Sequence, residues 1–108
     1  MPVVTATFDA GTAITNVVSI GNTQPLVLLM PDDWTAPANL KCLYSYDSTN
    51  WYLLCHSGKE WVAPCVPNTA WVLETNLWPK ASYVRLMSVF GGEDVNQEAD
   101  RVFQIITN

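Results

Sequence analysis

Charged side chains are scarce in this sequence. They make up 14% of its 108 residues, whereas about 25% is usual in soluble proteins. The five Lys and Arg residues are scattered singly along the chain, and the net charge is −5. Because nucleic-acid binding requires clusters of Lys and Arg that neutralise phosphates, the composition argues against a nucleic-acid partner.

Long apolar runs are also missing. The longest, Leu26–Met30, has the length of a strand, whereas a membrane span needs about 20 residues. The segment Met1–Val3 does not have the basic and then apolar character of a signal peptide. We therefore expect a soluble protein that is made in a cytoplasm and has no membrane partner.

Residues that carry chemistry are few. His56 is the only histidine, and Cys42, Cys55 and Cys65 lack the close spacing of a zinc knuckle. A nucleophile made from Cys55 or Cys65 with His56 would lack a third, orienting group. We expect three free, buried thiols that act as small hydrophobic residues, with one disulfide and one free thiol as the alternative. No catalytic residue, metal or cofactor is expected.

Three loop carboxylates, Asp32, Asp33 and Asp47, are the remaining candidates. They could contribute to a calcium site, which takes six or more oxygen ligands. The simpler interpretation is that Asp32 or Asp33 caps a short turn and that Asp47 closes an Asx-turn. A pair of acids for glycoside hydrolysis would have to face one cleft, and the sequence does not place them there.

What the sequence has in abundance is short β-branched and aromatic segments separated by turn residues. Such segments, recurring about every 8–12 residues, are typical of a sandwich or barrel. We therefore expect one domain over residues 1–108, an all-β antiparallel β-sandwich of jelly-roll type with about eight or nine short strands. The expected strands are Val3–Phe8, Ile14–Ile20, Leu26–Met30, Leu40–Tyr46, Trp51–Cys55, Trp61–Pro64, Trp71–Glu74, Tyr83–Ser88 and Arg101–Ile106.

The last expected strand is apolar on both faces. Phe103 and Ile105 share one face with Arg101, while Val102 and Ile106 make the other face apolar as well. Such a strand is central in its sheet or is covered by a neighbour. In so short a chain, that cover can come from another subunit.

Five Trp, four Tyr and three Phe are more large rings than one small core easily hides. Trp51 opens a strand and is expected in the core. Trp34, Trp61 and Trp78 are expected at the surface, either in a subunit contact or as a platform on which glycans stack. The polar stretch Gly91–Asp100 is expected to be a mobile loop. The predicted partner interface consists of Trp34, Trp61, Trp78, Arg101, Val102 and Ile106.

Four motifs follow one another along the chain. They are M-P-D-D-W-T-A-P-A at 30–38, S-x-D-x-x-x-W at 45–51, Y-V-R-L-M-S at 83–88 and N-Q-E-A-D-R-V-F-Q-I-I at 96–106. In this order the chain resembles a family of small β-sandwich virion structural proteins of tailed bacteriophages and prophages. The matching residues are Met30, Pro31, Trp34, Thr35, Ala36, Leu40, Ser45, Asp47, Trp51, Tyr83, Arg85, Leu86, Ser88, Asn96, Gln97, Ala99, Arg101 and Phe103. Many relatives have Gly in the turn after the Asp, where this chain has Ser48-Thr49-Asn50.

The resemblance implies a virion protein without enzymatic activity. A capsid decoration (cement) protein fits the composition best: it would form a homo-oligomer, with a trimer favoured, and would bridge subunits of the major capsid protein on the capsid surface. It would be made in the host bacterial cytoplasm. The alternatives are a tail, neck or head-fibre module that binds host-surface glycans, and an adaptor in the tail or neck.

Overall fold

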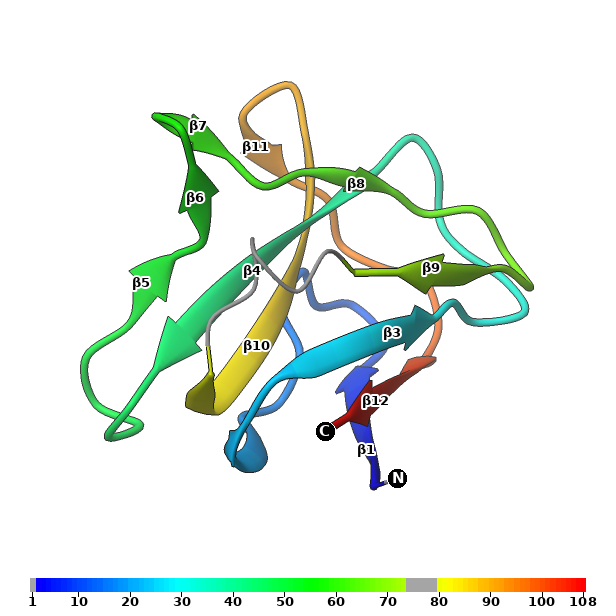
Figure 1. Cartoon of the computed structure of the whole chain (residues 1–108). Coiled ribbons are helices and arrows are strands. Elements are labelled where there is room, and N and C mark those ends of the chain that lie inside the picture. The colour runs from blue at the N-terminus through cyan, green and yellow to red at the C-terminus, as the bar shows by residue number, and fades with distance from the viewer. Residues whose placement is uncertain (1, 74–79) are drawn as a thin grey trace.

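The computed structural model describes residues 2–73 and 80–108 and shows two antiparallel β-sheets that face each other (Figure 1). This confirms the all-β sandwich expected from the sequence. Within the described residues the strands are β1 (Val3–Phe8), β2 (Val18–Thr23), β3 (Pro25–Leu29), β4 (Asn39–Ser45), β5 (Tyr52–Leu53), β6 (Cys55–His56), β7 (Lys59–Glu60), β8 (Ala63–Pro64), β9 (Ala70–Val72), β10 (Ala81–Phe90), β11 (Glu93–Asp94) and β12 (Arg101–Thr107).

The connections between the two sheets follow the jelly-roll pattern. One sheet has the order β1-β12-β3-β9, and in the other β10 pairs with β4 along one edge and with β2 along the opposite edge. Strand β5 extends the second sheet beyond β4. Along the eight strands β1, β2, β3, β4, β5, β9, β10 and β12, the chain crosses from one sheet to the other at every step except β4 to β5, which is the double Greek key of a jelly roll. Strands β8 and β11 are short additions to β4 and β10, and β6 and β7 form a separate hairpin.

The core lies between the sheets and is built by alternation along the strands. Leu40, Cys42 and Tyr44 of β4 are buried, as are Phe103 and Ile105 of β12, in agreement with the sequence pattern. The strand expected over Leu40–Tyr46 ends one residue earlier, because Tyr46 lies past the end of β4 and is exposed.

The tryptophan at the centre of the core is Trp34, not Trp51. Trp34 lies in the β3–β4 loop, is 7% exposed, and meets the rings of Phe8 and Phe103 edge to face at centroid distances of 5.4 Å. Trp51 is only half-buried, and the Arg85 guanidinium lies 5.9 Å from the centre of its ring. The expected core position of Trp51 is therefore wrong, because its ring packs beside an outward-facing side chain of β10.

The β4–β5 turn has the expected Asx geometry. Asp47 Oδ1 accepts hydrogen bonds from the backbone N–H groups of Thr49 (2.9 Å) and Asn50 (2.8 Å). These backbone donors hold the pKa of Asp47 well below its ordinary value, because they stabilise the carboxylate. Ser48 takes the left-handed conformation (φ 63°) at a place where Gly would meet no steric cost.

Candidate interaction face

The sheet β1-β12-β3-β9 presents an unbroken apolar row on the side that faces away from the core. The strand register places Val3 opposite Ile106, Ile106 opposite Val27, and Val27 opposite Val72. Val72 is 75% exposed and Val3 is also exposed, while Val27 and Ile106, on the two central strands, are half-buried by their neighbours. One β-branched residue from each strand therefore contributes to a continuous exposed stripe.

Two further rows complete this side of the sheet. Thr5, Gln104, Leu29 and Ala70 lie opposite one another in the second row, and Thr7 lies opposite Val102 in the third. We call this surface the outer face. It consists of Val3, Thr5, Thr7, Val27, Leu29, Ala70, Val72, Val102, Gln104 and Ile106.

None of the outer-face residues carries a charge, although the whole chain has a net charge of −5. Depletion of charged residues distinguishes the centre of a protein–protein interface from ordinary surface. A side of a sheet that is exposed only to water would normally carry polar and charged residues. The outer face is therefore suited to contact another protein surface, and its neutrality allows an acidic partner to approach without repulsion.

The structure brings together only part of the predicted interface. Val102 is 47% exposed and Ile106 is half-buried, and both lie on the outer face. Trp61 is half-buried and packs against the core, and Trp78 lies outside the described residues.

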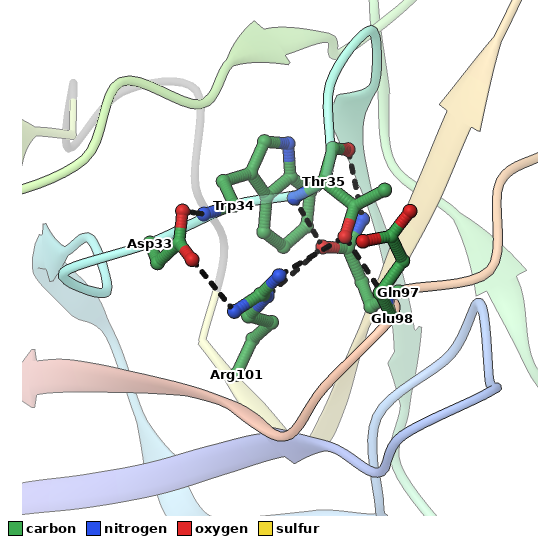
Figure 2. Close-up of polar contacts among 6 residues, drawn as sticks. All are labelled: Asp33, Trp34, Thr35, Gln97, Glu98 and Arg101. Carbon is green, nitrogen blue, oxygen red and sulfur yellow. Dashed lines mark hydrogen bonds and ion pairs between the residues drawn. The ribbon is translucent and has the colours of Figure 1, made fainter.

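The expected positions of Trp34 and Arg101 at the partner interface are wrong, because both side chains are buried and point into their own chain. Trp34 Nε1 donates a hydrogen bond to the carbonyl of Ala38 (3.1 Å), so both the ring and its polar atom are engaged inside the protein. The buried side chain of Arg101 contacts Asp33 Oδ2 (3.4 Å) and Thr35 Oγ1 (3.0 Å), as Figure 2 shows. Arg101 therefore ties strand β12 to the β3–β4 loop rather than to a partner.

Gln97 is the centre of this internal network, and the sequence pattern did not predict its burial. Its Oε1 accepts hydrogen bonds from the Thr35 N–H (2.8 Å) and from Arg101 Nε (3.3 Å). Its Nε2 donates to the Thr35 carbonyl (3.3 Å) and to Ser88 Oγ (3.0 Å) (Figure 2 shows the contacts with Thr35 and Arg101). The stretch expected to be mobile thus contains a fully buried anchor. We call Asp33, Thr35, Ser88, Gln97 and Arg101 the loop clamp.

Exposed rings gather at another place, beside the β4–β5 turn. Tyr46 and Tyr52 are exposed and line an open groove of about 280 Å³ together with the more buried Tyr44 and Leu54. The remaining lining residues are Leu53 and Cys55. Trp34 is in the core and so does not contribute to the expected glycan platform. At this groove, tyrosines supply the exposed rings.

The three cysteines are free, and they differ in exposure. Cys42 is buried, which raises the pKa of its thiol, and partial burial raises the pKa of the Cys65 thiol to about 12. Cys55 is exposed, so the expectation that all three thiols are buried is wrong for this residue.

We predict that a thiol reagent at pH 8 modifies Cys55 rapidly in the native protein and modifies Cys42 and Cys65 only slowly. The reason is that the thiolate is the reactive species, and both burial and a raised pKa suppress it. The measurement is the time course of labelling, with peptide mapping of the modified sites. Cys55→Ser should remove the rapid phase; a rapid phase that persists in this variant would contradict the prediction.

The structure gives no support to the metal alternatives. Among the described residues, no group of three or more His, Cys, Asp and Glu side chains is placed to hold a metal ion. Asp47 is engaged by its own turn, and Asp33 contacts Arg101. Within the same residues, no helix is long and apolar enough to cross a membrane.

Comparisons with protein-family models, with curated proteins and with solved structures give no significant match.

Proposed function

We propose that this protein is a structural component of a bacteriophage particle, a capsid decoration protein that docks on subunits of the major capsid protein. The observation that carries the proposal is the outer face, a neutral and largely apolar sheet surface on an acidic protein. The motif resemblance supplies the class of partner. The jelly roll adds an analogy, because viral capsid domains use it, although unrelated proteins do so as well.

The size of the outer face fits docking in many copies. The strands β1, β12, β3 and β9 have 6, 7, 5 and 3 residues. At about 3.3 Å per residue and about 4.8 Å between strands, they give a face of roughly 330 Å². A stable one-to-one interface usually buries about 800 Å² on each partner. A single contact of this size is weak, but a repeating shell offers many neighbouring sites, and linked contacts gain strength through their effective concentration. Binding to the assembled shell alone would stabilise that shell by mass action.

The test compares two valine variants in their binding to purified expanded shells. Val102 on the outer face and Val62 between β7 and β8 are almost equally exposed, at 47% and 45%. We expect Val102→Lys to weaken binding at least about tenfold, because a charge buried against a partner loses its hydration. Val62→Lys is the matched control and should bind as the parent does. The measurement is co-sedimentation with shells over a range of protein concentrations.

Two results would reject the proposal. Equal binding of Val102→Lys and the parent would show that the outer face is not the docking surface. Shells that resist heat equally well with and without the protein would exclude the cement role.

One observation favours a second candidate, binding of host-surface glycans by a tail or head-fibre module. Tyr46 and Tyr52 offer exposed aromatic faces at the groove, and such rings can stack on the apolar faces of sugars. Titration of the protein with host surface polysaccharide separates the two candidates, since the decoration role requires no response. The number of copies per particle separates both from an adaptor: hundreds for decoration, and only a few for an adaptor in the tail or neck.

A further inference from the structure

Strand β1 forms one end of its sheet, and β12 is its paired strand among those described (Figure 1). The Thr107 N–H donates a hydrogen bond to the Pro2 carbonyl (3.0 Å), which shows that the backbone of Pro2 points toward β12. Because backbone groups alternate in direction along an antiparallel strand, those of Val4 also point toward β12. Those of Val3 and Thr5 point the other way, toward the free edge.

The far end of this edge is closed by the protein itself. The Thr7 N–H donates to Asn16 Oδ1 (2.9 Å), and the Asn16 N–H donates back to the Thr7 carbonyl (3.3 Å). No described residue makes the corresponding contacts with Val3 or Thr5. Two N–H donors and two carbonyl acceptors are therefore presented in line along the open part of the edge.

The open part of β1 also lacks the features that usually prevent strands from pairing at an edge. Residues Val3 to Thr5 include no charge, no proline and no bulge. The edge strand β2 differs, because Gly21 and Asn22 within it have φ values of 62° and 58° and its pairing with β10 shifts register. Such irregularities twist an edge away from further partners. Unlike β2, strand β1 is thus regular and unprotected along its open part.

We propose that two copies of this chain associate through antiparallel pairing of their β1 strands. With Val4 opposite Val4 of the partner subunit, Val3 lies opposite Thr5 of the partner subunit, and the reverse holds by symmetry. Each such pair exchanges two backbone hydrogen bonds, so four form in total. The occupant is a second copy because this register is self-complementary, closes after two subunits, and places no charged β1 side chain opposite another.

The pairing has a consequence for the outer face. Residues directly opposite each other in a sheet lie on the same side, so the two outer faces become neighbours on one continuous sheet. The combined surface measures roughly 660 Å², which approaches the size of a stable interface on one partner, about 800 Å². The inference therefore deepens the proposed function, although the dimer itself does not require it. It differs from the trimer that the motif resemblance implies.

The first test is sedimentation equilibrium from micromolar to millimolar protein, with two substitutions at one position. Thr5→Pro removes the outward N–H and leaves the pairing with β12, since proline is tolerated on an edge where its nitrogen faces solvent. Thr5→Val keeps the N–H and the β-branched shape. We expect a monomer–dimer equilibrium for the parent and for Thr5→Val, and at least about tenfold weaker association for Thr5→Pro.

The second test needs no substitution and reads the edge directly. Amide hydrogen exchange of the parent chain should slow at Val3 and Thr5 as protein concentration rises. Thr7 serves as the internal control, because its N–H is bonded to Asn16 at every concentration. A monomer throughout the range, or an oligomer in which the Thr5 amide still exchanges freely, would overturn the proposal.

The two proposals fail separately. A monomer that binds shells through Val102 would refute β1 pairing and leave the decoration role intact. A β1-paired dimer that binds no shell would support β1 pairing and refute the decoration role.

Discussion

Replacement of Trp34 by alanine is expected to lower the free energy of unfolding by about 3–5 kcal/mol. The indole ring is 7% exposed and fills the centre of the core, edge to face with Phe8 and Phe103. Its removal leaves a cavity between the two sheets and takes away aromatic contacts from both neighbours. The Ala38 carbonyl also loses the N–H of the indole as its hydrogen-bond donor.

The measurement is chemical denaturation followed by circular dichroism, with Trp51→Ala as the matched control. Trp51 is half-buried and its ring faces the Arg85 guanidinium, so its truncation should cost less than half as much. Equal losses for the two variants would show that Trp34 is not the central packing residue. A loss below about 1 kcal/mol for Trp34→Ala would place its ring at the surface.

The two tryptophans show where the sequence pattern misleads. Trp51 precedes a strand and was expected inside, whereas Trp34 follows two aspartates in a loop and was expected outside. Alternation predicts the face of a residue within a strand, but it does not predict how a loop folds over the end of a sandwich. Asp33 Oδ1 accepts a hydrogen bond from the Trp34 N–H (2.9 Å) and Asp33 Oδ2 contacts Arg101, so the polar neighbour helps to hold the loop over the core.

The strands themselves were largely predictable from local pattern. Val3–Phe8 has the bounds that the sequence indicated, and the inward face of β12 follows the expected alternation. The apolar character of Val102 and Ile106 also signalled that the second side of β12 was unusual. The complete outer face was not predictable, because it depends on pairings such as Val3 with Ile106, which lie at opposite ends of the chain.

Arg101 illustrates the same limit for polar residues. A charged residue at the start of an apolar strand was interpreted as an intermolecular contact. Its partners Asp33 and Thr35 are more than sixty positions away in the sequence, and only the fold brings them within reach. The Arg101–Asp33 ion pair is itself partly open to solvent and contributes little, so the value of the loop clamp lies in its buried amide, Gln97.

Substitution of Gln97 by leucine is therefore expected to lower the free energy of unfolding by about 3–5 kcal/mol, because several buried polar groups lose their partners together. The Thr35 N–H and carbonyl lose both of their contacts with the amide, and Ser88 Oγ loses its donor. Leucine has a similar volume, so the loss reports hydrogen bonding rather than a cavity.

Gln104→Leu is the control, because Gln104 is an exposed glutamine on the outer face and its replacement should change the free energy of unfolding by less than about 0.5 kcal/mol. Amide exchange adds a local measurement: the Thr35 N–H should lose its protection in Gln97→Leu and keep it in Gln104→Leu. Equal stability of the two variants would mean that Gln97 contributes little to holding the β3–β4 loop. A selective loss in Gln97→Leu would establish that the buried amide of Gln97 fixes the β3–β4 loop over the core, although Gln97 itself lies in a stretch that the sequence indicated to be mobile.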